Sequence, residues 1–463
     1  MKKTSLLILM VFIVSALISA CSSGSNNGGT KSTTAATDTA VKDSSKQAVD
    51  ASGEPAELRY TIWDTNQQPA YQKIINEFQK ENKNIKVTLQ VVPWANYWDK
   101  LNTEIAGGTA PDVFWNYIPY VAGLANKGAL LDINPYVSKD KVDLSKFNKS
   151  LLDGFVEGDK RYAIPKDWDT MGLFYNKEAL KAAGIDEFPK DLEFNTQDGG
   201  SFVKFLQKAT IDKNGKHADE AGFDPKNIKQ YGFMFIDRGQ IDSGHLAGFA
   251  ASNGATVLKD SKLQLDDKLQ NTFSFLYDLV YKYNVHPSYT DVHTSGSDAK
   301  FFSGQVAVWM QGSWMMKPIQ DGASFKWGIA PMPKGPAGRV VRVNGLGDTI
   351  YSKSKHPEAA WKFASFIASQ KGQDILGETG TVFPGNSDSI SKFVDFYKGI
   401  GIDPTVFVDE FKGGTTLSPA HTNQNEWSNI FVKYSSLSLA GQMDPVTAMK
   451  KIKEEGDAIA PAK

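Results

Sequence analysis

Several tryptophans in this chain stand directly beside acidic or amide residues. Three such groups are Trp63-Asp64, Trp115-Asn116 and Asp167-Trp168-Asp169. An indole plane can pack against the C–H face of a ring, and a carboxylate can accept hydrogen bonds from two adjacent hydroxyls. These neighbours therefore favour reversible binding of a polyhydroxylated ring, such as a sugar. Structural interpretations stay open: residues 167–169 could form a solvated acidic turn, and Asp64 could cap a helix beside a core tryptophan.

The segments around these groups alternate between strand and helix patterns. Apolar residues at every second position, Leu58, Tyr60 and Ile62, predict a strand that ends at Trp63-Asp64. The spacing then predicts a helix over 71–78, a strand over 85–91, a helix from Trp94 that stops at Gly107-Gly108, and a strand over 112–116. This alternation indicates a mostly parallel sheet with helices on both faces, whose ligand crevice lies beyond the carboxyl ends of the strands.

The same rhythm resumes further along the chain. Strands are predicted over 171–175 and 306–310, and Asn176 can cap the helix that follows the first of them. A helix is predicted over 357–368, and two more between residues 423 and 458. The strands fall into two groups. Together with a length of 463 residues, which exceeds one core of ordinary size, they predict two α/β lobes.

Four segments in this order resemble one family. They are WANYWDKL (94–101) running into AGGTAPDV (106–113), YAIP (162–165) running to GLFYNK (172–177), FFSGQVA (301–307) running to GSW (312–314), and KHPEAAW (355–361). Together they resemble the extracellular solute-binding proteins, family 1, of carbohydrate ABC importers, of which maltose-binding protein is the best-known member. The resemblance implies an α/β fold of two lobes, the type II periplasmic-binding-protein fold, with doubly wound sheets joined by a hinge that closes on a sugar.

The resemblance also implies domain bounds and partners. Lobe 1 would take residues 57–165 with a return segment at about 327–384, and lobe 2 would take 166–326 with about 385–463. The implied partners are a mono- or oligosaccharide and the membrane permease subunits of an ABC importer, with the protein acting as a monomer. The stretch 188–230 matches no motif that assigns it a role.

Further candidate residues depend on this resemblance. Trp94 and Trp314 match positions that supply stacking platforms, although Trp94 alone could equally be core and Trp314 could pack beside Met315 and Met316. Residues 344–348 would cross back between the lobes, and Trp427 could reach the cleft or pack in the core. The expected ligand-binding residues are Trp63, Asp64, Trp94, Asn116, Asp167, Trp168, Asp169, Trp314, Gly345, Asp348 and Trp427, with Arg342 and Tyr175 as lesser candidates.

Composition and motifs argue against other classes. Lys+Arg 51 against Asp+Glu 52 gives no basic footprint for nucleic acid. There is no H-E-x-x-H and one Cys, so neither a metal site nor a cofactor is predicted. We expect a binding protein and not an enzyme. The alternative is a glycoside hydrolase, whose two carboxylates would stand about 5 to 9.5 Å apart. A glycan-binding sensor without transport is a third class.

The amino terminus carries an export pattern. Lys2 and Lys3 precede an apolar run over 6–18 and small residues before Cys21, which resembles a bacterial lipoprotein signal. We predict a signal peptide over 1–20, lipidation at Cys21 and a disordered tether over 21–56, because that stretch has too little apolar surface to fold. The expected location is the outer face of the cell membrane.

Overall fold

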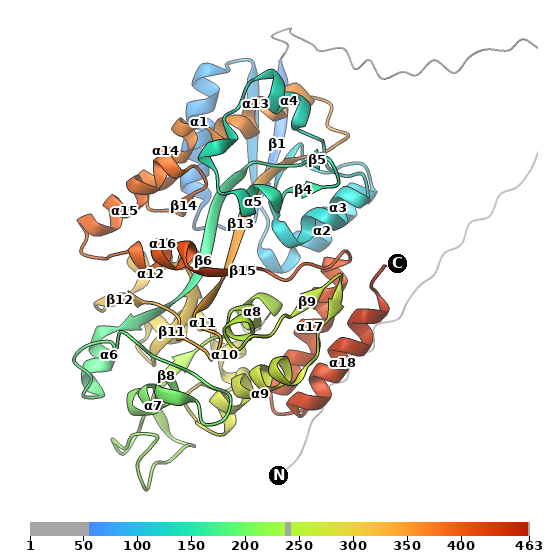
Figure 1. Cartoon of the computed structure of the whole chain (residues 1–463). Helices are drawn as coiled ribbons and strands as arrows, with labels where there is room; N and C mark the ends of the chain where they lie inside the picture. Colours follow the sequence, from blue (N-terminus) through green and yellow to red (C-terminus); the bar gives the residue numbers. More distant parts are fainter. Residues whose placement is uncertain (1–54, 237–241, 462–463) are drawn as a thin grey trace, which may run out of the picture. The chain divides into compact units, whose positions relative to one another are not determined.

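Two long strands, β6 (Pro165–Asn176) and β13 (Val340–Ile350), form the centre of the main sheet (Figure 1). The computed structural model describes residues 55–236 and 242–461, which belong to one unit of the chain. The predicted signal peptide, Cys21 and the tether as far as residue 54 lie outside the described residues. β6 pairs with β13 through residues 165–170, and with β11 and β12 through residues 171–176. It therefore continues through both halves of the sheet.

The first half of the sheet contains the strands predicted nearest the amino terminus. They are β1 (Ala56–Ile62), β2 (Ile85–Val91) and β3 (Val113–Tyr117), with β1 parallel to both of the others. Helix α1 (Gln68–Glu81) joins β1 to β2 and buries Tyr71, Ile74, Ile75 and Phe78, the apolar positions that predicted it. The strand–helix–strand beginning is confirmed.

The second half of the sheet lies beyond β6. It contains β11 (Val306–Gly312), β8 (Ile228–Met234) and the edge strand β7 (Ile211–Asp212). β11 runs parallel to β8, while β12 (Trp327–Ala330) pairs with the end of β6. The stretch 188–230 supplies α7 (Gly200–Ala209), β7 and the start of β8.

The prediction of a mostly parallel sheet is wrong at the centre. β13 runs antiparallel to both β3 and β6, and β6 runs antiparallel to β11. Parallel neighbours are joined by a crossover, usually a helix, as β1 and β2 are by α1. β13 instead follows β12 through an irregular connection over 331–339, so the pattern of alternating strands and helices does not apply there.

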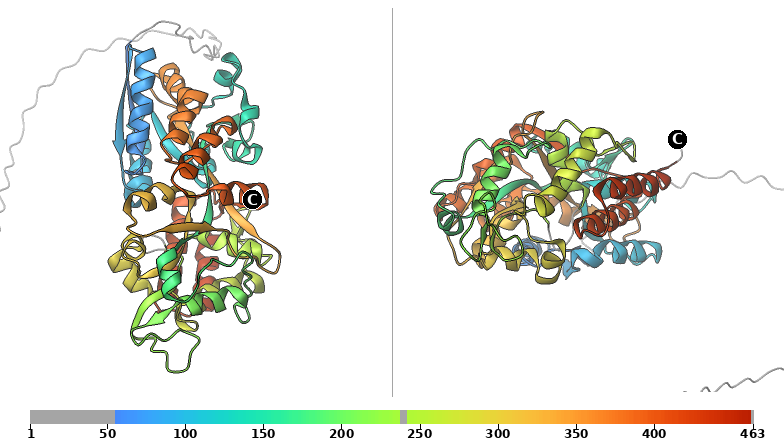
Figure 2. Two further views of the ribbon diagram at one scale, coloured as in Figure 1. Left: turned by 90° about the vertical axis from the view of Figure 1, so that its left-hand side faces the viewer. Right: turned by 90° about the horizontal axis from the view of Figure 1, so that it is seen from below.

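The other predicted helices are present. They are α2 (Trp94–Ala106), α6 (Lys177–Ala182), α13 (Pro357–Ala368), α17 (Gln424–Leu439) and α18 (Pro445–Ala458). Gly108 follows α2 with φ 70°, a conformation that glycine adopts without steric cost. The last two helices lie side by side and α18 packs on α9 (Asp267–Tyr281) (Figure 2).

Several shorter elements complete the surroundings of the site. They are α3 (Ile118–Asn126), α8 (Ser243–Ser252), η2 (Ser313–Met315), β14 (Phe383–Pro384), α16 (Thr405–Lys412) and β15 (Gly414–Leu417). Within residues 55–236 and 242–461, none of the helices has the length and apolar character needed to cross a bilayer.

Candidate functional site

A cavity with aromatic walls lies alongside β6 and β13. It encloses about 970 Å³ of space between protein atoms, including its open mouth. The predicted residues that line it are Trp63, Asp64, Trp94, Asp167, Trp168, Asp169 and Trp314. They come from the segment after β1, the start of α2, β6 and η2. The cavity therefore brings indoles and carboxylates together from segments that are far apart in the sequence.

Two of the other predicted residues, Asn116 and Gly345, belong to strands that line the cavity but lie next to the lining residues, on the other face of the strand. Asn116 is fully buried in β3, whereas its neighbour Tyr117 lines the cavity. On β13 a Cβ at position 345 would meet Leu151 and Ile118, while Asn344 and Leu346 line the cavity. Successive side chains of a strand point to opposite faces, so Asn116 and Gly345 face away from the cavity.

The remaining two predicted residues are buried elsewhere. Asp348 accepts a hydrogen bond from the Tyr60 hydroxyl at 2.6 Å, and Tyr60 in turn accepts one from Trp115 Nε1 at 2.7 Å. Asp348 is therefore part of the protein core and does not line the cavity, and burial raises its pKa to about 7. Trp427 is fully buried on α17 and stacks on His421 at 5.7 Å, which agrees with the core alternative.

Some lining residues were not predicted as leading candidates. They are Gln67, Tyr117, Met171, Asp242, Gly244, His245, Arg342, Asn344, Leu346 and Val382. Alternation along the strands could have indicated some of them, because Arg342, Asn344 and Leu346 are at every second position of β13. Asp242 and His245 could have been found as a cap and first-turn pair at the start of α8, since the Asp242 side chain accepts from the His245 backbone N–H.

Trp63 and Trp94, which both line the cavity, are held in place by aromatic rings. Trp63 is half-buried, and its ring lies edge-on to Trp94 at 5.2 Å, to Tyr97 at 4.9 Å and to Trp115 at 4.9 Å. Edge-to-face packing is the favoured arrangement for such rings. Trp63 covers Trp115, which explains why Trp115 is fully buried although it shares a strand face with Tyr117. The wall is therefore a fixed surface on which a ligand ring could stack.

Trp314 also lines the cavity, and the residue two positions before it makes its position possible. A Cβ on Gly312 would lie 1.8 Å from the Trp314 ring, so only glycine allows the indole to fold back over the end of β11. The ring then lies against the Arg342 guanidinium, whose Cζ is 5.4 Å from its centroid. Trp314 is half-buried and so keeps surface available in the cavity.

Asp64 both lines the cavity and stabilises a turn. Its Oδ1 accepts from Asn66 N at 2.9 Å and its Oδ2 accepts from Gln67 Nε2 at 3.0 Å. Asp64 does not cap a helix, because α1 begins after Gln67 without a side-chain cap; its carboxylate instead stabilises the turn before α1. A carboxylate held by local donors keeps its remaining lone pairs in a fixed direction.

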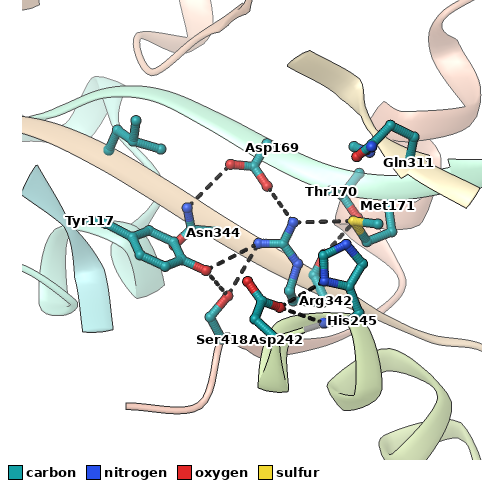
Figure 3. A network of polar contacts seen from close by, with 12 residues as sticks. Tyr117, Asp169, Thr170, Met171, Asp242, His245, Gln311, Arg342, Asn344 and Ser418 are labelled. Atoms are coloured by element: carbon teal, nitrogen blue, oxygen red, sulfur yellow. Dashed lines mark hydrogen bonds and ion pairs between the residues drawn. The ribbon is translucent and has the colours of Figure 1, made fainter. Parts of the chain in front are cut away.

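Arg342 is the centre of a polar network that spans several elements (Figure 3). Its Nη2 donates to Asp169 Oδ1 at 2.9 Å, and its Nη1 donates to Ser418 Oγ at 3.2 Å. Asn344 Nδ2 donates to the other oxygen of Asp169 at 3.2 Å, and the Tyr117 hydroxyl donates to Ser418 at 2.7 Å. The network fixes the carboxylate of Asp169 at the cavity wall.

The carboxyl groups of the site differ in their pKa values. Burial raises the pKa of Asp169 to about 6, and the nearby Arg342 guanidinium only partly opposes this effect. For Asp242 burial acts in the same direction, but the adjacent His245 and Arg342 outweigh it, so its pKa lies below the usual range. His245 Nδ1 is 2.8 Å from Asp242 Oδ1. Two acidic groups of one cavity therefore hold protons with different affinity.

A buried lysine, Lys166, positions one of the carboxylates that line the cavity. Lys166 is fully buried, its Nζ donates to Asp167 Oδ2 and, at 2.8 Å, to the Tyr71 hydroxyl, and it lies 3.9 Å from the centroid of Trp115. Asp167 also accepts from Leu346 N at 3.3 Å. Burial raises the pKa of Asp167, while Lys166 favours its ionised form. Lys166 thereby orients a carboxylate that lines the cavity.

Trp168 contributes little exposed surface to the cavity. It is 3% exposed and lies between the rings of Phe383 and Phe411, with centroids 4.3 and 4.4 Å away. The arrangement as a whole offers indole surfaces and directed acceptors, the combination suited to a ring with an apolar face and hydroxyl groups.

Across the two described ranges, no group of three or more His, Cys, Asp or Glu is placed to hold a metal ion.

Comparison with known proteins places the chain among binding proteins. Residues 63–374 match the sequence model of the family described as bacterial extracellular solute-binding protein. The chain is 25% identical to the maltodextrin-binding protein MdxE of Bacillus subtilis, over 76% of this chain and 78% of that protein. It is also 25% identical to the maltooligosaccharide ABC transporter solute-binding lipoprotein of Streptococcus pneumoniae serotype 4, over 76% and 77%.

A solved structure shares the fold. It is the ABC substrate-binding protein Lmo0181 of Listeria monocytogenes in complex with cycloalternan, with a TM-score of 0.77 and 24% identity over 88% of this chain and 99% of that one. The predicted fold class, the two-lobed α/β fold of periplasmic binding proteins, is confirmed.

Proposed function

Because this chain belongs to the bacterial extracellular solute-binding protein family, we propose that it captures a sugar or oligosaccharide outside the cell and delivers it to a membrane ABC importer. The observation that carries this proposal is the convergence of Trp63, Trp94 and Trp314 with the carboxylates of Asp167 and Asp169 on one cavity. The names of the two relatives, both of which refer to maltose-type oligosaccharides, support the same ligand class.

The sheet supports a hinge mechanism. β6 continues from the first half of the sheet into the second, β13 pairs with it through residues 343–347, and residues of both strands line the cavity. Bending these two strands would bring the walls together around a ligand, and contacts made only in the closed state would shift the balance towards it. We place lobe 1 at 57–165 and lobe 2 at 166–326 with 385–463. The pairing of β12 with β6 beside β11 favours a return segment that starts at β13, later than residue 327.

The test of this function is a titration of purified protein with neutral mono- and oligosaccharides, followed by tryptophan fluorescence and calorimetry. We expect saturable binding, and we expect Trp314→Ala to weaken it about tenfold or more, because the variant removes a stacking surface. Trp361→Phe is the matched control, since Trp361 contacts Tyr136 and Asp140 and does not line the cavity. Unchanged affinity and quenching in Trp314→Ala would remove the leading site residue.

The proposal is for binding without catalysis. Asp167 and Asp169 are each engaged by a buried cation, Lys166 and Arg342, which suits fixed hydrogen-bond acceptors. Incubation with the same oligosaccharides is therefore expected to release no reducing ends. Hydrolysis that Asp167→Asn abolishes would contradict the proposal and favour a glycoside hydrolase.

We further propose that the protein is a monomer attached to the outer face of the cell membrane through a lipid on Cys21. The signal pattern over 1–20 and the polar composition of 21–56 support the attachment through Cys21. Cys21→Ser is expected to move the protein from the membrane fraction to the medium, as an immunoblot of both fractions would measure. Equal membrane retention of the wild type and this variant would contradict lipid attachment.

A further inference from the structure

Helix α16 packs against the strands β6 and β13 and against β15 (Figure 1). Its Phe411 stacks on Trp168 with ring centroids 4.4 Å apart. A Cβ on Gly172 would lie 2.5 Å from the Phe407 ring, so only glycine lets the helix approach β6 this closely. Asp169 lies between these two positions of β6 and lines the tryptophan-lined cavity. Because successive side chains of a strand point to opposite faces, α16 lies behind the stretch of β6 that presents this carboxylate.

The side chain of Glu410 joins α16 to the connection that leads into β13. Its Oε1 accepts from Met332 N at 2.8 Å, and the carbonyl oxygen of Met332 accepts from Arg339 Nε at 2.6 Å. Met332 lies between β12 and β13 in the chain. Glu410 therefore holds the helix to a segment that enters one of the two strands expected to bend during closure.

The carboxyl group of Glu410 is buried and only half satisfied. The residue is 7% exposed, and its Oε2 has no hydrogen-bond partner within residues 55–236 and 242–461. It lines a pocket of about 670 Å³, opening included. Burial of a charge without a partner is costly, so the uncharged acid is favoured. Burial accordingly raises the pKa of Glu410 to about 8, and Met332 N–H and Arg339 oppose this only in part.

Two further charged side chains line this pocket. Arg339 comes from the connection before β13, and Asp409 precedes Glu410 on α16. The uncharged lining residues are Pro331, Val341, Val406, Gly413 and Gly414. β6 presents Trp168 and Gly172 to the helix. An ionised Glu410 would be attracted by Arg339 and repelled by Asp409, and its Oε2 would need water from the pocket. Hydrating this oxygen requires α16 to move away from its present contacts.

We propose that Glu410 is a positioning residue for sugar binding: in its uncharged form it holds α16 behind Asp169, and its ionisation releases the helix and weakens binding. The inference rests on the proposed function, since it assumes that the tryptophan-lined cavity binds sugar. Glu410 acts through the helix and does not touch the ligand. If the uncharged form binds sugar more tightly, linkage requires that sugar binding favours the protonated carboxyl group.

The test measures sugar affinity against pH. Calorimetry would use a neutral oligosaccharide that binds at pH 7, and repeat the titration up to pH 9. The affinity is expected to fall about fivefold or more as pH rises through the pKa of Glu410. At pH 8, titrations in two buffers of different ionisation enthalpy should show proton uptake on binding. Equal affinity at pH 7 and pH 9 would overturn the role of Glu410 and leave the proposed function intact. Absence of sugar binding at every pH would contradict the proposed function itself.

A variant that cannot ionise identifies the group. Glu410→Gln keeps an oxygen that can accept from Met332 N–H, so its affinity is expected to be the same at pH 7 and pH 9, without proton uptake. Asp409→Asn is the matched control: Asp409 is exposed and lines the same pocket, and this variant should keep the pH dependence of the wild type. A loss of affinity at pH 9 in Glu410→Gln equal to that of the wild type would assign the effect to another group.

A second variant tests the electrostatics. Arg339→Gln removes the nearby positive charge, which makes ionisation of Glu410 less favourable, so the midpoint of the affinity loss should move to higher pH. An unchanged midpoint would contradict Glu410 as the titrating group. Asp169 and Asp348 have pKa values of about 6 and 7, so any effect of theirs occurs at lower pH and should persist in Glu410→Gln.

Discussion

Arg342 and Asp169 form a buried ion pair in the wall of the tryptophan-lined cavity. Arg342 is 5% exposed and donates hydrogen bonds to Asp169 and Ser418. It shares the acceptor Asp169 with Asn344, and its guanidinium lies over the Trp314 ring. A buried pair adds little net stability compared with apolar residues, but removing one partner leaves an uncompensated charge. We therefore interpret the pair as a device that positions an acceptor and an indole.

Arg342→Met is expected to lower the free energy of unfolding by about 3–5 kcal/mol at pH 8. The pKa of Asp169 is already raised to about 6 by burial, and loss of Arg342 would raise it further. A carboxyl group with a raised folded-state pKa contributes stability below its unfolded pKa, 3.8, and loses that contribution as pH rises through the folded value. The loss caused by the variant should therefore be smaller at pH 5 than at pH 8.

Urea denaturation at the two pH values measures this difference. The double variant Arg342→Met/Asp169→Asn is the control, because it removes both charges and should recover part of the stability at pH 8. An equal loss at pH 5 and pH 8 would show that the guanidinium acts through packing and not through charge.

At the scale of elements, strand alternation decides which side chains reach the cavity. Tyr117 lines it and Asn116 does not, and Asn344 and Leu346 line it while Gly345 faces Leu151 and Ile118. The correct segments were predicted in both strands, but the face was not. Face selection depends on pairing with neighbouring strands, and β13 pairs with β3, β6 and β15, none of which is adjacent to it in the sequence.

The side chain of Asn176 caps helix α6 at its junction with β6. Asn176 ends the strand, and its Oδ1 accepts from the backbone N–H groups of Glu178 and Ala179 at 2.9 and 3.0 Å. Asn176→Ala is expected to cost about 1 kcal/mol of stability through loss of the cap, measured by urea denaturation. Asn176→Asp keeps the acceptor and should lose less; equal losses in both variants would assign the effect to packing.

At the scale of the whole described unit, α3 meets the segment that leads into α17. A Cβ on Gly123 would lie 2.6 Å from the Thr422 carbonyl oxygen, so the two segments are in close contact. Tyr120, on the same helix, and Ser428 of α17 line the same cavity. Under the proposed bounds these segments belong to different lobes, so this contact would form when the lobes close.

Gly123→Ala is expected to oppose closure, because the added methyl group cannot fit without moving Thr422 away. Sugar affinity should fall about tenfold, and the radius of gyration with saturating sugar, measured by small-angle scattering, should exceed that of the wild type. Gly399→Ala is the control, since a Cβ at that position meets nothing within 4 Å. Wild-type affinity in Gly123→Ala would show that the contact is independent of ligand binding.

Apolar and polar patterns along the chain were enough to predict the local elements and the class of ligand. Apolar periodicity predicted β1, α1, β2 and α2, because burial of one face imposes a repeat on each element. Adjacent indoles and carboxylates, as in residues 167–169, predicted the ligand class. Three features emerged from the folded arrangement alone: β6 and β13 run antiparallel through the centre of the sheet, Asp348 and Trp427 are buried away from the cavity, and Arg342 joins Asp169 to Trp314. These features depend on contacts between distant segments, for which the local pattern of one chain contains no direct signal.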